Sequence, residues 1–158
     1  MDLTLLEKQS FWPHLSPEDQ QRVREQALTA HFSAGQAVKM GSCNCIGPLF
    51  VVRGILRVYL LSQDGREATI YRLRQNDACM LSASCVLSAI TFDVQIDAET
   101  DCDLIIIPTS LFSDLMSRNL YVENYVYRSS TERLSDLIQA VERMFFLDPA
   151  PACRRFPD

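Results

Sequence analysis

Apolar and polar positions change their spacing twice along the chain. Near the start, Ser16 can cap a helix, Pro17 suits a first helical position and two acidic residues follow, so a helix is predicted to about Leu28. Over residues 30–108, short apolar runs alternate with turn residues about every 8–12 positions, which predicts strands arranged as a barrel or sandwich. After Pro108 the spacing becomes helical.

The individual strands are marked by alternation and by turn residues. Between residues 91 and 99 apolar residues occupy every second position, which predicts one buried and one solvated face. Asp64 and Gly65 predict a hairpin turn, because both residue types tolerate positive φ. The predicted strands are residues 49–52, 55–61, 67–73, 91–99 and 104–107.

A long helix is predicted over residues 120–146, which contain no Gly and no Pro, and a shorter one over residues 110–118. Apolar residues recur in the long helix every three or four positions, and Ile138 and Phe145 form a second stripe. We expect this helix to join two copies of the chain, because a small roll does not cover both stripes; packing on the chain's own strands is the alternative. The expected dimer interface consists of Tyr127, Ser130, Leu134, Leu137, Ile138, Val141, Met144 and Phe145.

Length and composition narrow the class of protein. The chain has 158 residues, of which 47% are hydrophobic and 22% charged, as expected for one globular domain with an appended element. With a net charge of −5, the chain lacks the excess of basic residues that is typical of a free-standing nucleic-acid-binding protein. The longest uncharged run, residues 78–92, is too short for a membrane span, and the amino terminus does not resemble a signal peptide. We therefore expect a cytoplasmic protein without membrane contact, whose six cysteines are reduced.

Five short motifs occur along the chain in the same order as the predicted elements. They are FSAGQ at 32–36, FVVRGILRVY at 50–59, DGREATIYRL at 64–73, AETDC at 98–102 and IP at 107–108. Over about residues 10–148 the chain resembles the sensor half of the Crp/Fnr family of bacterial transcription regulators. This resemblance implies a mainly β fold with flanking helices: a cyclic-nucleotide-binding-like, double-stranded β-helix (jelly-roll-like) barrel, followed by a long C-terminal dimerisation helix.

The resemblance also implies a winged helix-turn-helix that reads DNA after the long helix. Residues 148–158 are too few for its helices, and Pro149 and Pro151 stand where one should begin. We expect a sensor roll over residues 1–118, a dimerisation helix over 119–147 and a disordered tail over 148–158. Truncation, a frameshift or natural loss would each explain the missing DNA-binding domain.

The segment that corresponds to the family's phosphate-binding cassette predicts the class of effector. Residues 78–92 contain no Arg, Lys, Glu or Gly, so they offer no charge to pair with a buried phosphate, and classical cyclic AMP binding is not expected. Their apolar lining suits an apolar or haem-like ligand, and plain core packing is the alternative. The candidate effector contacts are Leu73, Cys79, Met80, Leu81, Ser82, Ser84 and Leu137.

The cysteines leave further alternatives open. The segment that begins at Cys79 is similar to that of a carbon-monoxide-sensing haem activator of the family, but Leu81 replaces its histidine. Cys43 and Cys45 supply two of the four thiolates that an iron–sulfur cluster needs, or a reversible thiol switch. No dedicated metal site is expected. The thiol and haem candidates are Cys43, Cys45, Cys79 and Cys85.

Patterns typical of catalysis are missing from the sequence. It contains no nucleophile elbow, HExxH, P-loop or dinucleotide fingerprint, and a cupin-like enzyme would need more metal ligands than His14 and His31 provide. We expect the effector-sensing and dimerisation module of a Crp/Fnr-type regulator. Its expected partners are a second copy, a small effector of unknown identity and, through the missing domain only, DNA. A stand-alone ligand-binding or interaction protein of the same fold is the alternative.

Overall fold

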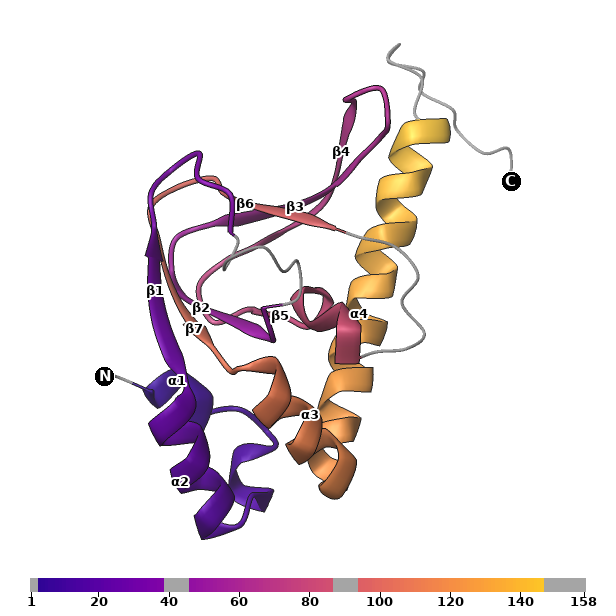
Figure 1. Cartoon of the computed structure of the whole chain (residues 1–158). Helices are drawn as coiled ribbons and strands as arrows, with labels where there is room; N and C mark the ends of the chain where they lie inside the picture. Colours follow the sequence, from indigo (N-terminus) through magenta and orange to yellow (C-terminus); the bar gives the residue numbers. More distant parts are fainter. Residues whose placement is uncertain (1–2, 39–45, 87–93, 147–158) are drawn as a thin grey trace.

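The computed structural model describes residues 3–38, 46–86 and 94–146, which form an N-terminal helical segment, two sheets and a long C-terminal helix (Figure 1). The N-terminal segment contains α1 (Thr4–Glu7), the 3-10 helix η1 (Trp12–His14) and α2 (Pro17–Gln26). The predicted cap of α2 is confirmed, because the Ser16 hydroxyl accepts a hydrogen bond from the Asp19 amide at 3.1 Å. The helix ends at Gln26, earlier than predicted, since the first strand follows at once.

The strands form two antiparallel sheets. The first contains β1 (Leu28–Phe32), β7 (Cys102–Ile106), β2 (Leu49–Arg53) and β5 (Ala78–Cys79), in that spatial order. The second contains β4 (Glu67–Leu73), β3 (Leu56–Leu61) and β6 (Gln95–Ala98). The predicted jelly-roll-like fold class is confirmed, although the two sheets do not join into a closed barrel among the described residues.

Several strand predictions agree closely with the structure. Strand β4 has the predicted bounds, and the turn before it places Gly65 at a φ of +85°. Strand β7 begins two positions before the predicted residue 104. Strand β6 covers only the second part of the predicted 91–99 strand, whose residues 91–93 lie outside the described part of the chain. Residues 81–86 form the 3-10 helix η2.

The hydrophobic core consists of two clusters. One lies in the roll and contains residues of both sheets, such as Leu56, Leu73 and Leu104. The other joins the N-terminal helices to α3 (Thr109–Arg118) and to the first turns of α4 (Leu120–Phe145), and it includes Phe11 and Phe112. The N-terminal part of the long helix is therefore held by a cluster distinct from the one inside the roll.

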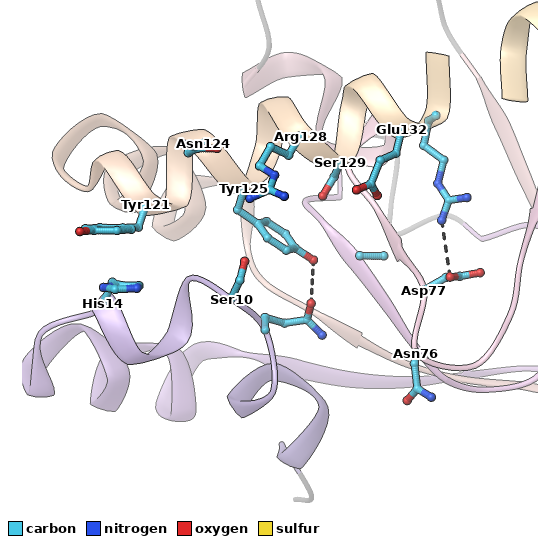
Figure 2. Close-up of a pocket in the computed structure, with 13 residues that line it drawn as sticks. Ser10, His14, Asn76, Asp77, Tyr121, Asn124, Tyr125, Arg128, Ser129 and Glu132 are labelled. Atoms are coloured by element: carbon cyan, nitrogen blue, oxygen red, sulfur yellow. Dashed lines mark hydrogen bonds and ion pairs between the residues drawn. The ribbon is translucent and has the colours of Figure 1, made fainter. Parts of the chain in front are cut away.

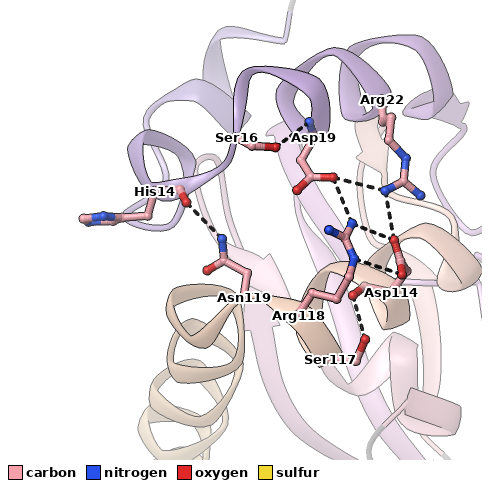
Figure 3. A network of polar contacts seen from close by, with 8 residues as sticks. All are labelled: His14, Ser16, Asp19, Arg22, Asp114, Ser117, Arg118 and Asn119. Atoms are coloured by element: carbon pink, nitrogen blue, oxygen red, sulfur yellow. Dashed lines mark hydrogen bonds and ion pairs between the residues drawn. The ribbon is translucent and has the colours of Figure 1, made fainter.

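A charged network holds α2 against α3 (Figure 3). Arg118 contacts Asp19 at 2.9 Å and Asp114 at 2.8 Å, and Arg22 contacts the same two carboxylates at 3.1 and 2.9 Å. Hydrogen bonds from Arg118 and Arg22 lower the pKa of Asp114 to about 2. Burial raises the pKa of Asp19, but hydrogen bonds from Arg118, Ser16 and Arg22 outweigh it and the net shift is downward.

Asn119 connects the N-terminal segment to the start of α4. Its side-chain amide donates to the His14 carbonyl at 2.9 Å (Figure 3). Its side-chain oxygen accepts from the Tyr121 amide at 2.9 Å. One residue therefore caps the long helix and ties it to η1. In the described part of the chain, no helix combines the length and the apolar content needed to cross a membrane.

Candidate functional site

The candidate site lies where α4 packs against the roll. The inner face of α4 carries Val122, Val126 and Ala140, which are all buried. The spacing of these residues keeps one stripe of the helix turned toward the rest of the chain over most of its length. Strand β4 of the roll packs against α4.

Arg133 makes the main polar contact between α4 and the roll. Its guanidinium lies 5.1 Å from the Tyr71 ring of β4, 3.6 Å from Asp77 after β4 and 3.1 Å from Asp136 on its own helix. The Tyr71 hydroxyl in turn lies 3.9 Å from the Cys79 sulfur. A continuous set of contacts thus leads from the predicted cassette to the long helix.

The structure brings most of the predicted effector contacts together. Leu73, Cys79, Leu81 and Leu137 belong to the same cluster inside the roll. Leu137 comes from α4, so this lining does include the long helix as predicted. Met80 packs into the other cluster, because consecutive residues of extended backbone point to opposite faces.

Polar groups in this lining have partners. The buried Ser82 hydroxyl donates to the Gly47 carbonyl at 2.7 Å and lies 2.9 Å from the Cys79 carbonyl. No buried side-chain nitrogen or oxygen among the described residues lacks a hydrogen-bond partner. The side chain of Ser84 lies outside the described residues. As it stands, the described lining is packed like core rather than arranged around a ligand.

The described cysteines of the roll are buried thiols. Burial raises the pKa of the Cys79 thiol, which favours the protonated form of the sulfur. No group of three or more His, Cys, Asp or Glu residues is placed to hold a metal over residues 3–38, 46–86 and 94–146. Cys43, Cys45 and the Cys85 side chain lie outside the described residues.

A polar pocket of about 480 Å³ lies between β4 and α4. It was not identified from the sequence, although Arg133, Asp136, Gln139 and Arg143 recur there every three or four residues, which was an available signal. Two of its arginines are neutralised, since Arg72 pairs with Glu99 at 2.6 Å and Arg133 pairs with Asp136. Its lining residues are Thr69, Ile70, Tyr71, Arg72, Arg133, Asp136, Gln139 and Arg143.

The outer face of α4 carries an apolar stripe that no described part of the chain covers. Leu134 and Ile138 are 55% and 54% exposed, although each is large and apolar. Of the predicted interface residues, Leu137 packs into the roll, and the half-buried Ser130 donates to the Val126 carbonyl of its own helix at 2.8 Å. The others form this exposed stripe: Tyr127, Leu134, Ile138, Val141, Met144 and Phe145. Leu120, which was not among the predicted interface residues, extends it.

No protein-family model matches the sequence, and no curated protein matches it. Solved structures do. The chain shares 35% identity and a TM-score of 0.84 with a protein from Eubacterium rectale that is assigned to the Crp/Fnr family of transcriptional regulators. That match covers 89% of this chain and 65% of the other. The predicted resemblance to the Crp/Fnr family is confirmed.

More distant Crp/Fnr-type structures share the fold. A CooA variant from Carboxydothermus hydrogenoformans has 18% identity and a TM-score of 0.63, with 94% of this chain and 91% of that chain covered. CLP from Xanthomonas campestris, a regulator responsive to c-di-GMP, has 16% identity and a TM-score of 0.65, with 84% and 66% covered. The matched part is the cyclic-nucleotide-binding region of these regulators.

Proposed function

We propose that this chain is the effector-sensing and dimerisation module of a Crp/Fnr-type transcription regulator. The observation that carries the proposal is the 35% identity and TM-score of 0.84 over 89% of the chain with a protein of that family. The matched structures are named as regulatory proteins rather than enzymes, which supports a non-catalytic role. DNA binding, in this proposal, belongs to a helix-turn-helix domain outside the described chain, and the module acts in the cytoplasm, where that DNA is.

The outer stripe of α4 is the proposed dimer interface. Leu120, Tyr127, Leu134 and Val141 follow one another at intervals of seven residues, as expected for the seam of two paired helices. Covering such a stripe with a second copy would contribute about 1.5–3 kcal/mol for each large apolar side chain that becomes fully buried. The proposed interface uses most of the predicted interface residues of α4. Its centre, however, is Leu134 and Ile138 rather than Leu137.

The proposed effector site remains the lining between the roll and α4. Leu73, Cys79, Leu81 and Leu137 form one apolar cluster in which the helix and the roll meet. A ligand that enters there has to move Leu137 away from the roll. Its affinity therefore differs between the two positions of α4, with Leu137 packed on the roll and with Leu137 displaced from it. This difference is what a sensor needs in order to change the geometry of the dimer.

Sedimentation of matched variants tests the proposed assembly. We expect a dimer at micromolar concentration for the wild type and a folded monomer for Leu134→Asp. Leu61→Asp is the control, because Leu61 is equally exposed, at 53%, but lies on the roll. A wild-type monomer, or equal dissociation of both variants, would overturn the proposed interface.

A further inference from the structure

A second pocket, of about 550 Å³, lies where three distant segments meet (Figure 2). The residues before α2, the turn between β4 and β5, and the first half of α4 each contribute one side of it. We call it the junction pocket. It shares no residue with the predicted effector lining, and its size is within the range of small-molecule sites.

Two opposite charges in the junction pocket are unpaired. Arg128 and Glu132 lie one helical turn apart on α4, and neither forms an ion pair or hydrogen bond with a described residue. Figure 2 shows both side chains on the side of the helix that faces Ser10 and Asn76. The other two charged groups, Asp77 and Arg133, already pair with each other at 3.6 Å.

The walls of the pocket are held by contacts between the N-terminal segment and α4. The Tyr125 hydroxyl donates to the Gln9 side chain at 2.8 Å (Figure 2). The His14 ring stacks on Tyr121 with a centroid distance of 3.7 Å and an interplanar angle of 3°. The pocket is therefore bounded on this side by groups that hold one another in place.

The remaining lining is rich in uncharged hydrogen-bonding groups. Ser10, Asn76, Asn124 and Ser129 are all among its lining residues. Hydroxyl and amide side chains can both donate and accept hydrogen bonds, so they can pair with either the donors or the acceptors of a polar ligand. The pocket thus offers one free cation, one free anion and neutral polar groups around them.

We propose that the junction pocket binds a small zwitterion of the α-amino acid class. The guanidinium of Arg128 matches a carboxylate, since its planar donors can bind both oxygens. The carboxylate of Glu132 matches an ammonium group. A purely anionic ligand would face Glu132 and Asp77, and a purely cationic ligand would face Arg128 and Arg133, so each is disfavoured relative to a molecule that carries both charges.

Calorimetric titration of the full chain tests this proposal. The probes are the twenty proteinogenic amino acids, titrated one at a time, followed by the α-carboxamide and the N-acetyl derivative of any that binds. We expect at least one amino acid to bind with a micromolar to millimolar Kd. Both derivatives should bind at least about tenfold more weakly, because each lacks one of the two charges.

Variants assign the two charges to their residues. Arg128→Met and Glu132→Gln should each weaken binding about tenfold or more. Arg143→Met and Glu142→Gln are the matched controls, since both residues are exposed on the same helix and do not line the junction pocket. The circular dichroism spectrum and sedimentation of each variant show whether it keeps its fold and assembly. Failure of all twenty amino acids to bind, or binding that survives both pocket variants, would overturn the proposal.

Discussion

The two faces of α4 have similar apolar side chains but opposite surroundings. On the inner face Val126 is 1% exposed, inside the cluster that joins the N-terminal helices to α3. On the outer face Val141 is 38% exposed and contacts no such cluster. The comparison shows that the sequence pattern of a helix marks which positions are apolar, whereas only its packing shows which of them still need a partner.

The largest expected effect comes from placing a charge on each face in turn. Val126→Asp buries a carboxylate with no partner and should reduce the free energy of unfolding by about 3–5 kcal/mol. Val141→Asp should change it by less than about 0.5 kcal/mol, as for an exposed site. Both are measured by urea denaturation in the Leu134→Asp background, so that dimerisation does not contribute. Equal effects would contradict the assignment of the two faces.

A smaller effect is expected at the polar contact of the inner face. Arg133→Met removes the ion pairs with Asp77 and Asp136 and the contact with the Tyr71 ring, and should reduce the free energy of unfolding by about 1 kcal/mol. Arg143→Met is the control, because Arg143 forms no ion pair with a described residue. If the two substitutions have the same effect in urea denaturation, Arg133 does not hold the helix on the roll.

The smallest expected effect concerns the charged network between α2 and α3, and it depends on pH. The pKa of Asp114 is about 2 in the folded chain, compared with its ordinary 3.8. The folded state therefore favours the ionised form, and the resulting stability is present above about pH 4 and is lost as the pH falls toward 2. The difference in unfolding free energy between wild type and Asp114→Asn should accordingly shrink over that interval. A difference that stays constant from pH 5 to pH 2 would contradict the role of this network.

Local signals in the sequence were enough to predict most of the fold. The cap at Ser16, the turn at Gly65 and the long uninterrupted helix depend on neighbouring residues only, and the structure contains all three. The side on which Leu137 packs could not be predicted in the same way. Both stripes of α4 are apolar, and the choice between them is made by strands far away in the sequence.

The candidate sites were predictable to different extents. Cys79 and Leu81 were selected because the family resemblance marks the cassette that contains them, and the structure does place them together with Leu73. The junction pocket left no comparable signal. It brings Ser10, Asn76 and Glu132 together from three segments, and no spacing rule along one element relates such residues.

The double role of Asn119 has a mechanical consequence. Because this residue fixes the start of α4 to the carbonyl of His14, the helix is held firmly at one end, while the large apolar side chains of its last turn, Met144 and Phe145, are exposed. The 26 residues of α4 extend about 39 Å from that fixed point. A tilt of about 5° at the base would displace the far end by about 3 Å, as follows from that length. A small change in the tilt of α4 at Asn119 thus becomes a larger displacement at its C-terminal end.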